Sequence, residues 1–218
     1  MKIRGKTLIT IGVTVICLIG LLHVVATAVI TNTVARLEEQ ATSQNVDRFV
    51  GALSHELDNL NSTARDYASW DDTYAFVQDN NTDYIDSNIV ESTFINLRLH
   101  FILFVNSTGQ IVFGKALDLK AKMEMPIPES MMEDVSAHDL LWHHETTESS
   151  IAGMILLPEG PMLVASRPIL TSQGQGPIQG ALIMGRFLDS AEMEYLNTTV
   201  HLPMTAQVLG DPWLSPDN

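Results

Sequence analysis

The sequence contains little cysteine and little positive charge. The first scarcity excludes an internal disulfide, and the second excludes a nucleic-acid partner. Cys17 is the single cysteine of the 218 residues, so no disulfide can form within the chain and a folded domain must be stabilised by its hydrophobic core. Only 12 Lys and Arg residues stand against 26 Asp and Glu residues, which gives a net charge of −14. Because phosphate backbones are bound by basic surfaces, this balance excludes nucleic acid as a partner.

The common signatures of enzymes are also missing. The sequence has no Gly-x-Ser-x-Gly elbow, no His-Glu-x-x-His pair and no phosphate-binding glycine loop. His143 and His144 follow His138 by five and six residues, which does not align them on one helical face, and no cysteine accompanies them. We therefore predict no catalytic residue, no metal site and no cofactor.

Charge is absent from the whole of residues 8–30, LITIGVTVICLIGLLHVVATAVI. At about 1.5 Å per residue, a helix of these 23 residues would cross a hydrocarbon layer of about 30 Å. Basic residues at positions 2, 4 and 6 precede it, and the positive-inside rule then places residues 1–7 in the cytoplasm. The sequence predicts a single-pass protein of the cell membrane, whose main domain is extracytoplasmic and carries nine basic and 26 acidic residues.

A cleaved signal peptide is the competing interpretation of the same segment. Ala26-Thr27-Ala28 has the small-x-small form of a cleavage site. The apolar run before it has about 18 residues, however, whereas signal peptides usually have about 7–15. The length favours an anchor, and both interpretations place the folded part outside the cell.

Beyond the apolar segment, residues 31–49 contain neither glycine nor proline and read as a stalk helix. Apolar or small residues then recur at alternating spacings of four and three, at Val46, Val50, Leu53, Leu57, Leu60, Ala64 and Tyr67. This heptad pattern fits either packing of the helix on its own domain or formation of a homodimer. We expect the helix to continue to about Gln78, where Asp79-Asn80-Asn81 is turn chemistry.

The rest of the chain predicts an α+β domain with an antiparallel sheet. Strands are expected at residues 100–105, 110–114, 150–157, 161–170, 177–188 and 204–209. One helix or two are expected over residues 83–99, and further helices over 131–142 and 189–200, the last with Asp189 as its N-cap and Glu192 completing a capping box. A polar end covers residues 210–218.

Several motifs occur in an order that is similar to a known family. They are Trp-Asp-Asp-x-Tyr at 70–74, Asn-x-x-Gly and Ile-Val-x-Gly within 106–114, Gly-Pro-x-x-Val-Ala-Ser-x-Pro-Ile at 160–169, and Gly-x-Leu-Ile-x-Gly-Arg at 180–186. Over residues 50–209 the set resembles the CHASE domain of the fourth type. The resemblance implies a PAS/Cache-like extracytoplasmic sensory domain of prokaryotic signalling receptors, such as those of two-component systems.

One feature departs from that family. Its receptors continue into a second transmembrane helix and an output module such as a histidine kinase or cyclase. This sequence ends at Asn218 without a second apolar run of 18 residues. We therefore expect a truncated receptor, a fragment of a longer one, or a sensor that pairs with another membrane protein.

The expected function is membrane-anchored binding of a small ligand for signal transduction. The alternative is a ligand-independent assembly module that pairs with a full-length receptor through the stalk. An exported hydrolase is a third candidate, and the missing nucleophile and metal motifs count against it.

The candidate ligand site is a polar–aromatic cluster formed by Tyr67, Trp70, Asp71, Asp72 and Tyr74. On one helix, all but Asp72 share a face, and an aromatic wall with a carboxylate suits a small cationic or hydroxylated ligand. A carboxylate ligand would instead be held by arginines, for which the candidates are Arg98, Arg167 and Arg186. The alternative is structural: a core tryptophan, with the aspartates capping a loop or pairing with an arginine.

Four Asn-x-Ser/Thr sequons are candidates for glycosylation of an exported domain. They begin at Asn61, Asn80, Asn106 and Asn197.

Overall fold

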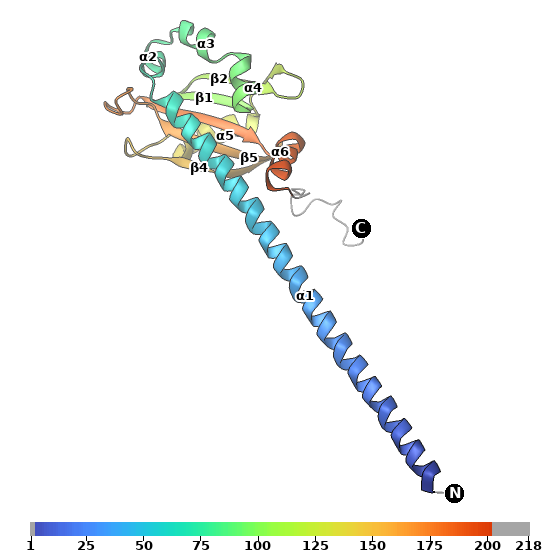
Figure 1. Cartoon of the computed structure of the whole chain (residues 1–218). Coiled ribbons are helices and arrows are strands. Elements are labelled where there is room, and N and C mark those ends of the chain that lie inside the picture. Colours follow the sequence, from blue (N-terminus) through green and yellow to red (C-terminus); the bar gives the residue numbers. More distant parts are fainter. Residues whose placement is uncertain (1–2, 202–218) are drawn as a thin grey trace. The chain divides into compact units, whose positions relative to one another are not determined.

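The computed structural model describes residues 3–201, so the predicted strand at 204–209 and the polar end at 210–218 lie outside the described residues. The chain divides into two compact units, Met1–Phe49 and Val50–Asn218. The packed core and the sheet belong to the second unit. Its elements are labelled in Figure 1.

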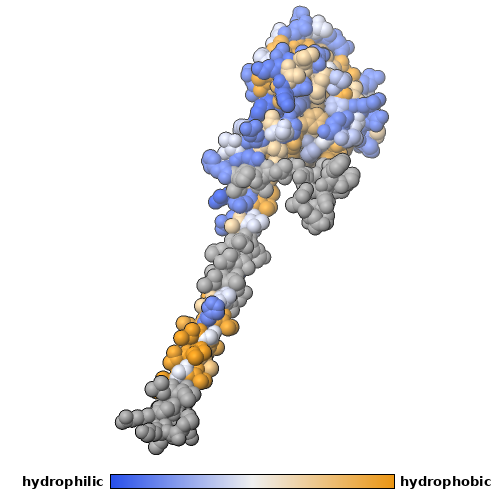
Figure 2. Space-filling view, turned by 90° about the vertical axis from the view of Figure 1, so that its right-hand side faces the viewer, coloured by the Kyte–Doolittle hydropathy of each residue, from blue (hydrophilic) through white to orange (hydrophobic). Residues whose placement is uncertain are grey.

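Helix α1, Ile3–Ala68, begins in the first unit and ends in the second, and it includes residues 31–49 (Figure 1). Most of the side chains described between residues 11 and 27 are apolar, and they are exposed (Figure 2). Among the residues that the structure describes, no helix is both long enough and apolar enough to cross a membrane.

The predicted continuation of this helix to Gln78 is wrong, because α1 ends at Ala68 and a new helix, α2, covers Asp71–Asp79. Trp70 between them is extended, with φ −90° and ψ 138°. The hydroxyl of Thr73 hydrogen bonds the carbonyl oxygen of Tyr67 at 2.7 Å, which satisfies an acceptor at the end of α1. Two aspartates in the first turn of α2 match the positive end of its dipole.

Two short helices follow, α3 over Thr82–Asn88 and α4 over Glu91–Leu97. The turn before them lies at the predicted position. Asn80 ends α2 in the left-handed conformation, and the side chain of Asn81 accepts from the backbone N–H of Asp83.

A six-stranded antiparallel sheet follows, as the sequence predicts for its fold class. The strands are β1 Phe101–Asn106, β2 Ile111–Asp118, β3 Met123–Met125, β4 Ile151–Leu157, β5 Gly160–Pro168 and β6 Gly180–Phe187. Their order is β3-β2-β1-β6-β5-β4, so the pairing of β1 with β6 joins two meanders into one sheet.

One face of the sheet packs on the helices before it. Phe104 of β1 lies opposite Leu182 of β6, and its ring meets those of Phe76 in α2 and Tyr84 in α3, with centroids 5.3 and 5.9 Å apart. Because side chains alternate along a strand, Arg186 lies on this face too, and it contacts Glu56 of α1.

The other face is covered by α5, Glu129–Ala137. Two fully buried residues of α5, Met131 and Val135, pack in one cluster with Phe101 and Leu103 of β1. The predicted helix over residues 131–142 is correct only in its first half, since α5 ends at Ala137 and a short 3-10 helix covers Asp139–Leu141.

The final described element is α6, Ser190–Val200. Asp189 caps it as predicted, by accepting from the backbone N–H of Glu192 at 2.9 Å. The other half of the predicted capping box is wrong: the Glu192 carboxylate contacts Arg186 and Arg98 instead.

Candidate functional site

The predicted cluster around Trp70 is engaged with its own chain. Trp70 stacks on Tyr67, with ring centroids 4.4 Å apart. The Asp71 carboxylate accepts from the backbone N–H and the hydroxyl of Ser172, both at 2.8 Å, and these bonds lower the pKa of Asp71. Tyr74 accepts from the side-chain amide of Gln179 at 3.2 Å. Ligand binding by this cluster therefore stays a prediction, and its contacts hold the β5–β6 connection.

Asp72 does not join the contacts to Ser172. It lines a separate hollow of about 270 Å³ between α2 and α3, beside Phe76 and Tyr84. Asp72 therefore lies apart from the rest of the cluster, as its position off their shared helical face predicts.

Two of the three candidate arginines form a buried ion network with two glutamates. Arg186 Nη1 lies 2.6 Å from Glu56 Oε2 and 3.4 Å from Glu192 Oε1. Arg98 pairs with Glu56 and also lies 3.3 Å from Glu192. Glu56, Arg186 and Glu192 are each at most 5% exposed, and burial raises the pKa of Glu192. The network balances two positive and two negative charges and joins α1, β6 and α6.

Arg167 lies elsewhere on the same face of the sheet. Its Nε donates to Asn61 Oδ1 at 2.8 Å, and its Nη1 donates to the carbonyl oxygen of Ser149 at 3.3 Å. Burial lowers the pKa of Arg167. The structure therefore does not bring the three arginines together as one anion site.

The sequon asparagines differ in their surroundings. Asn80 is exposed in a turn, whereas Asn61 accepts from Arg167 and Ser150. Asn106 accepts from the backbone N–H groups of Thr108 and Gln110. Asn197 is half-buried in α6. Their glycosylation stays a prediction.

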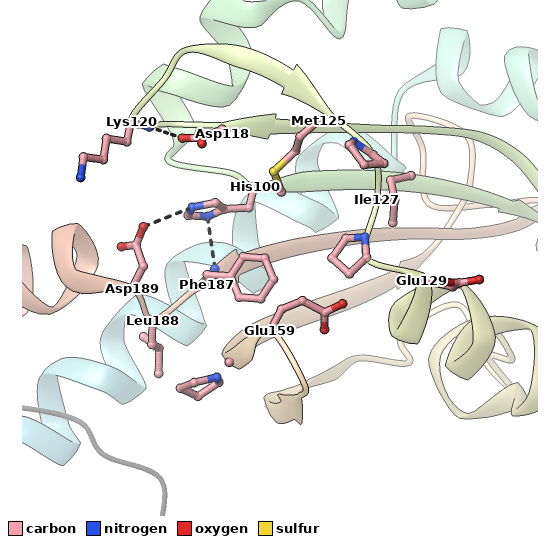
Figure 3. Close-up of a pocket in the computed structure, with 14 residues that line it drawn as sticks. His100, Asp118, Lys120, Met125, Ile127, Glu129, Glu159, Phe187, Leu188 and Asp189 are labelled. Atoms are coloured by element: carbon pink, nitrogen blue, oxygen red, sulfur yellow. Dashed lines mark hydrogen bonds and ion pairs between the residues drawn. The ribbon is translucent and has the colours of Figure 1, made fainter. Parts of the chain in front are cut away.

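A cavity of about 740 Å³ lies at one end of the sheet. The ends of β2 and β6, strand β3, the start of α5 and the β4–β5 turn surround it (Figure 3). It is lined by His100, Asp118, Lys120, Met125, Pro126, Ile127, Pro128, Glu129, Glu159, Gly160, Pro161, Phe187, Leu188 and Asp189. No residue of the predicted site is among them.

His100 is the buried polar group of this cavity, with 6% of its surface exposed. Its Nδ1 accepts from the backbone N–H of Phe187 at 3.2 Å, so the neutral ring carries its proton on Nε2. Nε2 lies 3.6 Å from Asp189 Oδ2 (Figure 3). Burial lowers the pKa of His100, although Asp189 opposes this. The imidazole is therefore neutral at pH 7 and presents an N–H toward Asp189.

Carboxylates flank His100 on the same side of the cavity. Asp118 Oδ1 accepts from the backbone N–H groups of Lys120 and Ala121, both at 2.8 Å, and these bonds lower the pKa of Asp118. Asp189 uses Oδ1 to cap α6. Each side chain thus fixes a turn of the backbone with one oxygen.

Two further carboxylates, Glu159 and Glu129, lie toward the α5 side of the cavity (Figure 3). Glu159 accepts from the hydroxyl of Ser130 at 2.8 Å. Apolar side chains, among them Met125, Ile127 and Phe187, lie between the two acidic sides. An apolar middle with a few polar groups is the usual chemistry of a small-molecule site.

Sequence reasoning missed this cavity, although one of its residues, Asp189, was identified as a helix cap. The available signal was the cluster of prolines at positions 126, 128 and 161, which marks loops at strand ends. Whether those loops meet depends on strand pairing. Among the residues that the structure describes, no three His, Cys, Asp or Glu side chains gather as a metal site.

Comparison with known proteins gives the family. The CHASE4 domain model matches residues 52–207. The methanogenesis regulatory histidine kinase FilI of Methanothrix harundinacea (strain 6Ac) is 34% identical over 164 residues, which cover 75% of this chain and 18% of FilI. The chain thus spans less than a fifth of that relative.

Two solved structures share the fold. One is a domain of a sensory box/GGDEF family protein from Vibrio parahaemolyticus, with a TM-score of 0.51 and 16% identity, covering 73% of this chain and 63% of the other. The second is the extracellular domain of the histidine kinase vpHK1S-Z8, with a TM-score of 0.50 and 15% identity, covering 74% and 59%. The family match, the α+β sheet and the sequence motifs agree: the chain belongs to the CHASE4 family of sensory domains.

Proposed function

We propose that this chain is the extracytoplasmic sensory part of a membrane receptor, and that it binds a small ligand in the 740 Å³ cavity beside His100. The observation that carries the proposal is the position of Asp189, which lines the cavity and also caps α6. A ligand that contacts Asp189 acts directly on the start of a helix, and a helix is an element that can carry a signal.

The proposed path continues from α6 to α1. Glu192 lies in the first turn of α6 and contacts Arg186, which in turn contacts Glu56 of α1. A ligand shifts this arrangement only if it binds one conformation more tightly than another. The path thus links a cavity contact to the helix that leads toward the N-terminus.

Membrane anchoring through residues 8–30 belongs to the same proposal. Its support is the absence of charge over 23 residues, the basic residues before them, and the exposed apolar side chains of the first unit (Figure 2). The N-terminus would be cytoplasmic and the CHASE4 domain extracytoplasmic.

The proposed output partner is a histidine kinase, with a cyclase as the alternative. FilI, which carries a similar segment, is a histidine kinase. The kinase would lie in the same polypeptide or in a separate membrane protein that pairs with this chain. We propose no enzymatic activity for the CHASE4 domain itself.

The cavity is tested by filling it. The variant Met125→Trp adds a large ring to the lining, and Met123→Trp is its matched control, since Met123 is 65% exposed on the same strand and does not line the cavity. The full chain in detergent is screened for thermal stabilisation by a library of small cationic, anionic and neutral compounds. We expect at least one compound to raise Tm, with the effect lost in Met125→Trp and kept in Met123→Trp.

The opposite result would favour the second candidate function, a ligand-independent assembly module. Its supporting observation is that Val46 and Val50, on the predicted heptad seam, are 46% and 53% exposed. If no compound stabilises the chain and sedimentation detects a tight dimer that Val50→Glu dissociates, the sensory proposal is wrong and the module is supported.

A further inference from the structure

We infer that the ligand of the cavity is an organic cation with an apolar body, such as a primary amine on an aryl or alkyl group. This inference rests on the proposed function and concerns the same site. It follows from the charges, the free acceptor atoms and the apolar middle of the lining.

The charge of the lining is the first step. Four of the fourteen residues are acidic, namely Asp118, Glu129, Glu159 and Asp189, and Lys120 is the one Lys or Arg among them. The Lys120 side chain is exposed and extends away from the Asp118 carboxylate (Figure 3). His100 adds no charge at pH 7, because burial lowers its pKa. The lining thus repels anions and attracts cations.

Free acceptor atoms are the second step. Asp118 and Asp189 use Oδ1 for backbone N–H groups, and Oδ2 of each has lone pairs that can accept from a ligand. Asp189 Oδ2 also faces the N–H of His100 Nε2 at 3.6 Å, and a carboxylate oxygen can accept from more than one donor. An ammonium group donates up to three hydrogen bonds and accepts none, so it matches oxygens that only accept.

The apolar middle gives the third step. Seven lining residues are apolar side chains or prolines: Met125, Pro126, Ile127, Pro128, Pro161, Phe187 and Leu188. Phe187 precedes Asp189 by two residues and presents its ring beside His100 (Figure 3). A cation at Asp189 lies near a ring that attracts it, and its apolar body covers the remaining surface. A bare metal ion would leave that surface exposed to water.

The test compares small molecules that share one apolar body and differ in the charge of their polar group. Isothermal titration of the full chain in detergent uses 3-phenylpropan-1-amine, 3-phenylpropanoate and 3-phenylpropan-1-ol as probes, with n-hexylamine as a second amine. Because the ammonium forms charge-assisted hydrogen bonds with the carboxylates and the alcohol does not, we expect at least one amine to bind about tenfold or more tightly than the alcohol. We expect the carboxylate to bind more weakly than the alcohol, and the preference for the amine to shrink with rising salt.

Two variants locate the effect. Asp189→Asn removes the charge but keeps a good N-cap, so α6 is retained, and it should weaken amine binding about tenfold while leaving alcohol binding unchanged. Glu145→Gln removes an exposed acid outside the lining and is the matched control, for which we expect less than a twofold change.

The inference is overturned if neither amine binds, if the alcohol or carboxylate binds as tightly as the amines, or if the two variants weaken amine binding equally. These results leave the proposed function standing when a library compound still stabilises the chain and Met125→Trp abolishes its effect. When no compound does so, the proposed function fails as well.

Discussion

His144 shows how neighbours decide the chemistry of a single residue. The Ser166 hydroxyl donates to the carbonyl oxygen of Leu141 at 2.5 Å, so it can only accept from His144 Nε2, 3.0 Å away. His144 Nδ1 is then unprotonated and accepts from the Ser149 hydroxyl at 2.9 Å. Burial lowers the pKa of His144 to about 4, with Arg167 and His143 adding to the effect. The ring is held neutral and all its hydrogen-bonding atoms are paired.

This residue makes stability depend on pH. The pKa of His144 is about 4 in the folded chain, below the ordinary value of 6.5, so the unfolded chain takes up its proton first as pH falls. The neutral His144 ring contributes fully to the free energy of unfolding above pH 6.5. This contribution, up to about 3 kcal/mol, is lost as the pH falls toward 4. His100 acts in the same direction, since burial lowers its pKa too. Urea unfolding between pH 7 and pH 4 should therefore show falling stability.

The variant His144→Gln keeps hydrogen-bonding atoms but cannot titrate in this range, so its stability should fall less steeply over the same pH interval. His138→Gln is the control, because His138 is exposed at the end of α5. Equal pH slopes for His144→Gln and the unchanged chain would contradict the assignment.

At the scale of elements, periodicity predicted most helices and strands, and the predictions that failed did so for local reasons. The break at Ser69-Trp70 was missed because the apolar spacing continues through it. The two aspartates at 71 and 72 and the hydroxyl of Thr73 nevertheless favour the start of a new helix there. Strand β3 was missed because its three residues are too few to show a period. Glu192 fitted a capping box by sequence, but the buried Arg186 and the half-buried Arg98 are stronger partners for its carboxylate.

The network of Glu56, Arg98, Arg186 and Glu192 should dominate the stability of the contacts between α1, β6 and α6. The variant Glu56→Gln leaves two arginines facing one carboxylate in a buried site, and breaking such a pair costs about 3–5 kcal/mol. Guanidinium unfolding measures this loss. Glu194→Gln, an exposed acid on α6, is the matched control and should change stability by less than about 0.5 kcal/mol. A loss below about 1 kcal/mol in Glu56→Gln would show that the network is not a main support.

At the scale of the whole molecule, the family could be predicted from the sequence and the cavity could not. The CHASE4 motifs are local strings of residues, which a reader can find without knowing the fold. The cavity is assembled from His100, residues 118–129, residues 159–161 and residues 187–189. These segments meet only because β6 pairs with both β1 and β5, and no local pattern specifies that pairing. The sequence pattern predicted the Trp70 cluster as the site instead, because its residues are close together in the chain.

The proposed path predicts a pattern of hydrogen exchange across the whole chain. If cavity binding acts through Asp189 and the ion network, a compound that binds there should slow exchange in α6 and in α1 around Glu56, but not in α2 and α3, which carry no residue of the cavity or network. Exchange monitored by mass spectrometry, with and without the best amine or library compound, measures this.

Glu192→Gln removes the charged contact of α6 with Arg186, so protection at α6 should persist while protection at α1 is reduced. Equal slowing of exchange in α1, α2 and α3 would indicate general stabilisation and contradict the path. Loss of the α1 effect alone in Glu192→Gln would establish that α6 and α1 are coupled through these buried charges.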